Sequence, residues 1–278
     1  MFGHPKFDAG KKTVLYIHGY MEAPSQESVN VIVNGYLKRN DHNILVLDWS
    51  ALAEGNYLFD AVPNAKLLAI KMSEAILDWI DEGLDVNRFH VVGISLGAQV
   101  AGLIGRSVIK KSTGESKLVR ITALDPTFPL FPALRIKPVN KNDAEFVDII
   151  HTDSWFYNSP KSTGTVDFWP NGGYTLQRDS PRRNYKYLVN SSDRYNHRRS
   201  WCYWAESVRP SEQSIFLSVR ANSWRSFKKG RVDNSAIIQM GIDCPLDARE
   251  GDYFLQTNAY KPFAKGVRGL HYEKNECK

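Results

Sequence analysis

Short apolar runs alternate with amphipathic stretches along the first two thirds of the chain. Apolar residues at helical spacing predict helices over 27–39 and 65–79. Five runs that are apolar nearly throughout predict buried strands, at 13–19, 43–49, 89–95, 119–125 and 146–152. Strands of this kind, separated by helices, are typical of a largely parallel sheet that helices cover on both faces. The pattern therefore predicts the α/β class.

Over roughly the last 70 residues the alternation weakens, although 215–221 and 252–258 still predict strands. We find no linker, internal repeat or low-complexity segment in the 278 residues. The length fits one large domain or two small ones. Because the pattern has no break, we expect a single domain over residues 1–278.

The composition is that of an ordinary globular domain, with 42% hydrophobic and 24% charged residues. No apolar run approaches the roughly 18 residues that span a bilayer, and residues 1–12 lack the apolar core of a signal peptide. The three cysteines are too few for a disulfide framework and do not have zinc-ligand spacing. We expect no metal and no other cofactor.

Positive charge is concentrated in one stretch. The net charge is +6, and residues 178–199 hold seven basic and two acidic residues. This distribution favours an acidic partner, although a solvated loop with surface arginines is an equally good interpretation. No nucleic-acid-binding motif accompanies the charge, so we do not expect nucleic acid as a partner.

The segment 89–107 carries the clearest chemistry. Gly93-Ile94-Ser95-Leu96-Gly97 is a G-x-S-x-G motif with an apolar strand before it and an apolar-periodic helix after it. A serine at such a sharp turn is strained, and Gly93 and Gly97 avoid collisions around it. The turn predicts Ser95 as a nucleophile at the N-terminus of a helix, which favours developing negative charge.

A nucleophilic serine needs a general base, and the base needs an acid that orients it. In this fold the order along the chain is serine, then the acid, then the histidine that serves as base. Asp125 ends a predicted strand and precedes Pro126, which places it at the sheet edge where active sites lie. Asp148 lies in mid-strand, whereas Asp153 and Asp167 lie in later loops. Asp125 is therefore the predicted acid.

Two histidines remain as candidates for the base after the other five are set aside by chain order or by closeness to the C-terminus. His197 precedes an aromatic-rich helix and can be carried on a loop over the sheet edge, whereas His151 ends a buried strand. We expect His197 to be the base and His151 to be a structural histidine beneath the site. The backbone N–H groups of Leu96 and Tyr20 are the predicted oxyanion donors, because Gly19 permits a close approach.

These residues lie in blocks that resemble the pancreatic lipase family, especially its insect members. The blocks run in the family's order and spacing: IHGY, VLDW, GISLGAQVAG, ALDPTFPLF, NDAEFVDIIHTD, GTVDFWPNGG and HRRSWCYWAES. The resemblance implies a secreted α/β-hydrolase that cleaves acyl esters of glycerolipids at a lipid surface. Its triad falls on Ser95, Asp125 and His197, and its oxyanion donors fall on Tyr20 and Leu96, in agreement with the elimination above.

The sequence departs from the family at several positions. Ile94 and Gln99 replace the two histidines of the usual GHSLGAH, and Ser180 and Tyr195 stand where a disulfide brackets the family's lid. The family's calcium loop resembles 140–143, with an asparagine in place of one carboxylate, which weakens a hard-cation site. No C-terminal β-sandwich follows, so no colipase-type partner is implied. The oxidising compartment that the resemblance implies suggests a Cys244–Cys277 disulfide and a free Cys202.

Three functions are compatible with this sequence. The first is an ester hydrolase acting on glycerolipids, either a triacylglycerol lipase or a phospholipase A1, with the basic charge favouring the latter. The second is a non-catalytic, yolk-type lipid-binding protein on the same scaffold. The third is a hydrolase of small soluble esters. Because yolk-type relatives lose the nucleophile and this chain keeps all three triad residues, we expect an enzyme.

Overall fold

The computed structural model describes residues 4–127, 136–154, 161–174, 177 and 191–274, with backbone alone at 191–194. Its described part contains a nine-stranded sheet in the order β2-β1-β3-β4-β5-β6-β9-β7-β8. The strands from β2 to β9 in this order are parallel, and β7 is antiparallel to both β9 and β8. This arrangement is the predicted α/β-hydrolase fold.

The five predicted strands form the parallel half of the sheet, each a residue or two shorter than its apolar run. They are β1 (Lys12–Ile17), β2 (His42–Leu47), β3 (Phe89–Ile94), β4 (Arg120–Leu124) and β5 (Phe146–Ile150). The helices between them are α1 (Glu27–Arg39), α2 (Val62–Asp81) and α3 (Leu96–Lys111). Both helices predicted from apolar spacing are confirmed.

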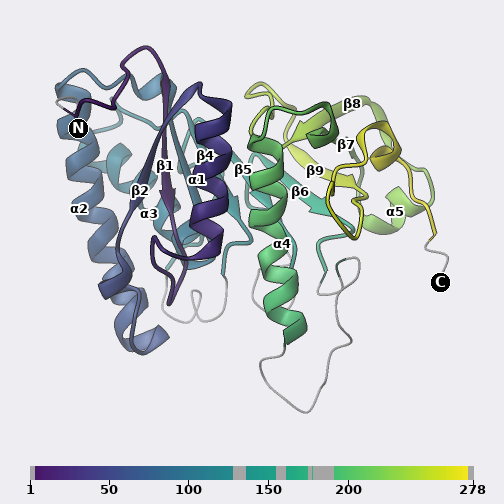
Figure 1. Ribbon diagram of the computed structural model, residues 1–278, viewed down its shortest axis with the longest axis horizontal. Helices are drawn as coiled ribbons and strands as arrows, with labels where there is room; N and C mark the ends of the chain where they lie inside the picture. Colours follow the sequence, from purple (N-terminus) through teal and green to yellow (C-terminus); the bar gives the residue numbers. More distant parts are fainter. Residues whose placement is uncertain (1–3, 128–135, 155–160, 175–176, 178–190, 275–278) are drawn as a thin grey trace.

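Helices cover both faces of the sheet. On one face α2 and α3 pack on inward residues such as Leu15, Val91 and Ile121. On the other face α1 packs beside α4 (Ser191–Val208) over Tyr16, Val92 and their neighbours. Figure 1 shows α1 and α4 side by side in front of the strands. Because the strands are buried from both sides, their sequences are apolar throughout rather than alternating.

The other end of the sheet was only partly predicted. The strands β7 (Phe216–Arg220) and β9 (Gly251–Leu255) coincide with the two later apolar runs. The pattern missed β6 (Val166–Pro170), which contains Asp167 and ends at a proline, and β8 (Asp233–Met240), which begins with three polar residues. It also missed the short helix α5 (Trp224–Lys228) and the π-helix η2 (Tyr57–Ala61). Short 3-10 turns complete the described part: η1 (Ser50–Leu52), η3 (Val86–Arg88), η4 (Glu212–Ser214) and η5 (Gly266–Leu270).

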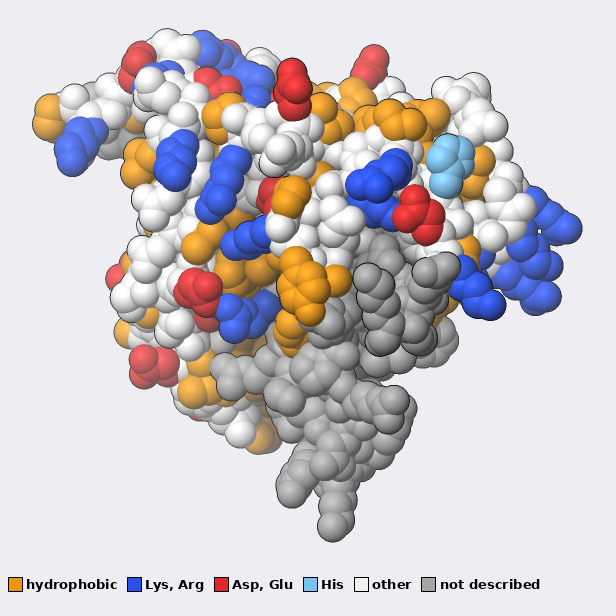
Figure 2. All heavy atoms as spheres, turned by 45° about the vertical axis from the view of Figure 1, so that its right-hand side comes forward, with side chains coloured by type: hydrophobic (Ala, Val, Ile, Leu, Met, Phe, Trp, Pro, Cys, Tyr) orange, Lys and Arg blue, Asp and Glu red, His pale blue; other side chains and the backbone are white. Residues whose placement is uncertain are grey.

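Two sequence-based expectations depend partly on residues outside the described ranges. Most of the basic stretch, including Arg182, Arg183 and Lys186, falls there, and so does Cys277. Cys202 is a free thiol as expected, whereas Cys244 is a free, buried thiol, contrary to the disulfide expected for it. In the part of the chain that is described, no helix is long and apolar enough to cross a membrane. Figure 2 shows Lys and Arg side chains spread over one face among acidic and apolar ones.

Candidate active site

Ser95 sits at the turn between β3 and α3, and its backbone is strained. Its φ of 56° and ψ of −121° lie in a region that non-glycine residues rarely occupy, at a cost of about 1–3 kcal/mol. Ser95 is also the one residue between Phe89 and Gly102 that is not buried. The turn therefore lifts this side chain out of an otherwise buried segment, as an attacking serine requires.

The two glycines of the motif are needed because backbone lies against them. A Cβ added to Gly93 would lie 2.3 Å from the carbonyl oxygen of Gly97. A Cβ added to Gly97 would lie 2.3 Å from the carbonyl oxygen of His18, at the end of β1. Any side chain at either position would push the turn away from β1, so the predicted roles of both glycines in the turn agree with the packing.

Asp125 follows β4, the strand next to β3, and reaches the same edge of the sheet. The Ser95 N–H donates to the carbonyl of Leu124 at 3.0 Å, which ties the serine turn to the end of β4. Asp125 itself has a φ of 44° and is fully buried. Its Oδ1 accepts from the N–H groups of Thr152 (2.7 Å) and Asp153 (3.0 Å), just after β5.

His197 meets the other oxygen of this carboxylate. Its Nδ1 lies 2.6 Å from Asp125 Oδ2, and its side chain is 22% exposed. The predicted base and acid, 72 residues apart in sequence, are thus brought together at the sheet edge where β3 and β4 end. This contact fixes the orientation of the imidazole and leaves Nε2 as the nitrogen that can take a proton.

The pair shifts the pKa values of both groups toward their charged forms. Burial alone lowers the pKa of His197, but the hydrogen bond and charge of Asp125 outweigh it, and Glu22 adds to the rise, so the pKa is raised. Burial likewise raises the pKa of Asp125, but the His197 contact and the N–H groups of Thr152 and Asp153 lower it overall. A buried aspartate that stays ionised stabilises the imidazolium formed when His197 accepts a proton.

One feature of His197 differs from the expectation. It lies inside α4 rather than on a loop ahead of the helix. Ser191, Ser192 and Asp193 precede it, and serine and aspartate are preferred at helix N-termini, so the helix begins earlier than its aromatic residues suggest. The helical backbone places His197 more firmly than a loop would.

Two of the competing acids, Asp148 and Asp167, and the second histidine have structural partners. His151 is 1% exposed, contacts Asp167 Oδ1 through Nε2 at 2.7 Å and stacks on Trp169 with ring centroids 3.8 Å apart. Asp148 pairs with Arg120 inside the core. The location of His151 agrees with its expected structural role.

The predicted oxyanion donors flank Ser95. Leu96 follows it in sequence, and Tyr20 lies one residue beyond Gly19, whose added Cβ would be 3.2 Å from the Cβ of Ser95. Within the described chain, neither the Tyr20 N–H nor the Leu96 N–H donates a hydrogen bond. Two unpaired N–H groups on either side of a serine suit a developing oxyanion.

Glu22 was not predicted, yet it fixes the loop that carries Tyr20. Its Oε2 accepts from the Gly19 N–H at 2.8 Å, and its Oε1 accepts from the Ser28 hydroxyl at 3.3 Å. The Tyr20 side chain is held as well, by donating to the carbonyl of Gly55 at 2.6 Å and by an edge contact with Tyr57. No sequence motif marks Glu22, because its role depends on the turn bringing its carboxylate back onto Gly19.

The family comparison agrees with this geometry. A family described as Lipase matches residues 3–263, nearly the whole chain. The chain belongs to the lipase family. This match confirms the resemblance to pancreatic lipases that the motif blocks indicated.

Other members of the lipase family are similar over most of this chain. Lipase member H of Oryctolagus cuniculus is 30% identical over 85% of this chain and 50% of its own length. Lipase member H-A of Xenopus laevis is 29% identical over 88% of this chain and 51% of its own length. Vitellogenin-3 of Drosophila melanogaster is 33% identical over 73% of this chain and 47% of its own length. The chain spans about half the length of these relatives.

Apolar side chains lie on or near residues 19–22 of this lipase-family chain, the loop that carries Tyr20 and that we call the oxyanion loop after its predicted role. Met21 is 65% exposed and its N–H donates to the carbonyl of Ala53. Phe59, on η2 beside Tyr57, is 79% exposed. Tyr57 in turn approaches the Thr127 hydroxyl, two residues after Asp125. We call Met21, Tyr57 and Phe59 the apolar rim.

Proposed function

We propose that this chain is a carboxylic ester hydrolase that cleaves acyl esters of glycerolipids, with Ser95, His197 and Asp125 as its catalytic triad. The contact of 2.6 Å between His197 Nδ1 and Asp125 Oδ2, beside the strained Ser95, carries the proposal. A structural aspartate–histidine pair would not require a partly exposed serine in a strained turn at the same sheet edge. Membership in the lipase family supports the same chemistry.

The residues divide the reaction into two steps. The Ser95 Oγ attacks the ester carbonyl carbon while its proton passes to Nε2 of His197, and the carbonyl oxygen becomes an oxyanion that accepts from the Tyr20 and Leu96 N–H groups. The carbon–oxygen bond to the alcohol then breaks, and the alcohol leaves with the proton from His197. Water, deprotonated by His197, attacks the acyl-enzyme and releases the fatty acid and free Ser95.

A lipid surface is the proposed partner of this site. Met21 and Phe59 expose apolar side chains next to the oxyanion loop, where the acyl chains of an interfacial substrate would arrive. The basic residues at 178–199 would attract anionic headgroups, which favours phospholipids over neutral triacylglycerols as the substrate. A lipid substrate and a secreted family together lead us to propose an extracellular location.

The decisive experiment replaces the nucleophile. Ser95→Ala should lower the rate of fatty-acid release on the order of a millionfold, because loss of a triad serine removes the covalent step. The purified variant and wild type would be compared on phosphatidylcholine vesicles, triolein emulsion and a soluble short-chain ester. Ser107→Ala, on the same helix and half-buried, is the matched control and should keep full activity. A Ser95→Ala protein with a tenth of the wild-type rate would refute the triad.

The yolk-type alternative has one observation in its favour, the 33% identity to Vitellogenin-3. A storage role would predict that the wild-type chain binds lipid but releases no fatty acid from any of the three esters. The same panel therefore separates the two functions. Phosphatidylcholine cleavage that exceeds triolein cleavage would support the phospholipase assignment, and the reverse order would replace it with a triacylglycerol lipase.

A further inference from the structure

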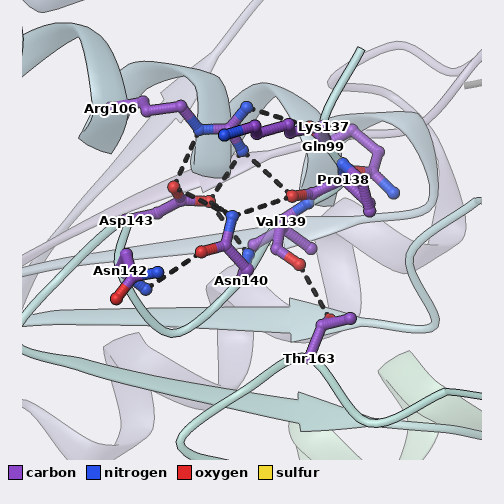
Figure 3. Close-up of polar contacts among 9 residues, drawn as sticks. All are labelled: Gln99, Arg106, Lys137, Pro138, Val139, Asn140, Asn142, Asp143 and Thr163. Carbon is purple, nitrogen blue, oxygen red and sulfur yellow. Dashed lines mark hydrogen bonds and ion pairs between the residues drawn. The ribbon is translucent and has the colours of Figure 1, made fainter. Parts of the chain in front are cut away.

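Arg106, on α3 and 11 residues after Ser95 in sequence, holds the loop 137–143 against that helix. Its Nε and one terminal nitrogen donate to the two carboxylate oxygens of Asp143, both at 2.8 Å. Its terminal nitrogens also donate to the carbonyls of Lys137 (2.9 Å) and Pro138 (3.0 Å). Figure 3 shows these oxygens converging on the single guanidinium. One positive group thus closes the whole loop.

The loop lies so close to α3 that only small helical residues fit beneath it. A Cβ added to Gly105 would lie 2.0 Å from the carbonyl oxygen of Asp143, and one added to Gly102 would lie 2.9 Å from Asp143 Oδ2. Asp143 is 1% exposed as a result. A buried carboxylate of this kind needs a positive partner in place at all times.

The resemblance to pancreatic lipases implies a calcium ion in this loop, and the residues present do not fit one. Calcium needs six to eight oxygen ligands. Both oxygens of Asp143 and two of the loop carbonyls already face the guanidinium. Asn140, at the position where a carboxylate is expected, turns its amide nitrogen toward the Pro138 carbonyl at 3.0 Å. Among the described residues, no group of three or more His, Cys, Asp or Glu side chains could hold a metal ion.

We propose that Arg106 is a built-in replacement for the divalent cation of this loop, which makes the fold and any activity of this chain independent of calcium. The guanidinium supplies the charge and the planar pair of donors that match a carboxylate. Unlike a bound ion, it cannot be lost to dilution or to a chelator.

The same helix connects this loop to the catalytic edge. Gln99, two turns before Arg106 and 2% exposed, accepts from the Val139 N–H at 2.8 Å and donates to the Thr127 carbonyl at 2.6 Å. The Thr127 N–H in turn donates to the carbonyl of Ser95 at 3.3 Å. Gln99, which replaces a histidine of the usual family motif, therefore couples the loop held by Arg106 to the segment after Asp125.

The first test uses the wild-type chain. Its melting temperature, and its hydrolysis of a soluble ester if it is active, would be measured with excess chelator and with millimolar calcium. We expect the two melting temperatures to agree within about 1 °C, because no calcium contributes to folding. A melting temperature that falls with chelator and recovers with calcium would overturn the proposal. Thermal unfolding needs no substrate, so this result does not depend on the proposed hydrolysis.

The second test removes the guanidinium. Arg106→Ala should lower the melting temperature by about 10 °C, because it leaves a buried carboxylate unpaired. Lys110→Ala is the matched control, since Lys110 lies one turn later on the same helix, is exposed and lines the same hollow of about 250 Å³. Equal melting temperatures for the two variants would show that Arg106 holds nothing in place.

Two further variants separate charge from geometry. Arg106→Lys keeps the charge but loses the paired donors, so we expect a smaller fall that still leaves a folded protein. The double variant Arg106→Ala with Asn140→Asp has carboxylates at positions 140 and 143 and no guanidinium beside them. Millimolar calcium should raise its melting temperature by several degrees and leave that of the wild type unchanged. A calcium response as large in the wild type as in this double variant would refute the replacement.

Discussion

Ser95 can keep its strained backbone only because the neighbouring chain leaves no room for another conformation. The carbonyls of His18 and Gly97 lie where side chains at Gly97 and Gly93 would be. The close backbone contacts at the two glycines thus hold Ser95 in the strained turn that presents the proposed nucleophile. Its geometry is set by close backbone contacts rather than by side-chain packing.

Replacing one of these glycines tests whether the turn at Ser95 depends on these close contacts. Gly97→Ala should destabilise the protein by about 1–3 kcal/mol and greatly reduce hydrolysis, because its Cβ would overlap the carbonyl of His18 and displace the turn. Gly35→Ala is the control, since an added Cβ on α1 would meet its nearest neighbour at an ordinary 3.4 Å. Denaturant unfolding and ester hydrolysis would be measured on both. A Gly97→Ala protein as stable and as active as Gly35→Ala would show that the turn tolerates a side chain.

The contact between His197 and Asp125 predicts a pH dependence. His197 accepts a proton only when it is neutral, and its pKa is raised by Asp125. The value of kcat/KM should therefore fall as the pH drops through a pKa above the roughly 6.5 of a free imidazole. Asp125→Asn should lower kcat by about 10⁴-fold and move the remaining acid limb to lower pH, because the partner charge is gone. If the acid limb of the kcat/KM profile does not move in Asp125→Asn, a group other than Asp125 sets the pKa seen in that profile.

At the scale of elements, α4 is the member whose position matters most, because it carries His197. Its Trp204 is fully buried, with the guanidinium of Arg120 5.7 Å from the ring centroid and the His90 ring 5.7 Å away. Arg120 is held by both oxygens of Asp148 at 2.8 Å and by the carbonyls of Gly241 and Ile242. A buried ion pair on β4 and β5 thus lies beneath the helix that carries the base.

Breaking this pair from one side should be costly. Asp148→Asn leaves a buried guanidinium without its charge partner, so we expect a loss of about 3–5 kcal/mol in the free energy of unfolding. The double replacement Arg120→Met with Asp148→Leu should cost much less, because neither charge remains. Glu74→Ala, which removes surface ion pairs with Lys71 on α2 and Lys111 on α3, should change stability by about 1 kcal/mol or less. Equal losses in the single and double variants would show that the pairing itself contributes little.

The elements differ in how far their sequences predict them, for physical reasons. The strands from β1 to β5 are buried on both faces, so their apolar runs are unmistakable. The exposed side of β8 leaves only part of its residues apolar. Strand β6 carries the buried Asp167, whose partners, His151 and the N–H groups of Thr163 and Gly164, are known only from the fold. The contact of His197 with Asp125 was predictable because chain order and strand ends restrict the candidates. The contact of Arg106 with Asp143 was not, because neither residue lies at a predicted strand end or in the G-x-S-x-G motif.

At the scale of the whole molecule, we propose that the sheet edge with Ser95, Asp125 and His197 is the face that meets a lipid surface. The oxyanion loop and η2 both lie at this edge, joined by the contacts of Tyr20 with Gly55 and Tyr57. Met21 and Phe59 expose apolar surface there, whereas the comparably exposed Val267 lies on η5, at the antiparallel end of the sheet. Apolar exposure beside an active site is typical of interfacial binding.

This arrangement predicts which side chains govern binding to lipid. Phe59→Ser combined with Met21→Ser should weaken binding to anionic phospholipid vesicles about tenfold or more, because burying each apolar side chain in the interface contributes on the order of 1 kcal/mol. Hydrolysis of a soluble short-chain ester should stay near the wild-type rate, since neither side chain takes part in the chemistry. Val267→Ser is the matched control and should bind vesicles as the wild type does. Sedimentation with vesicles at low and high salt would separate the apolar contribution to binding from the electrostatic one. We attribute the electrostatic, salt-sensitive contribution to the basic residues at 178–199 and expect it to persist in the Phe59→Ser, Met21→Ser variant. Unchanged vesicle binding by the rim variant would place the lipid-contacting surface elsewhere on the molecule.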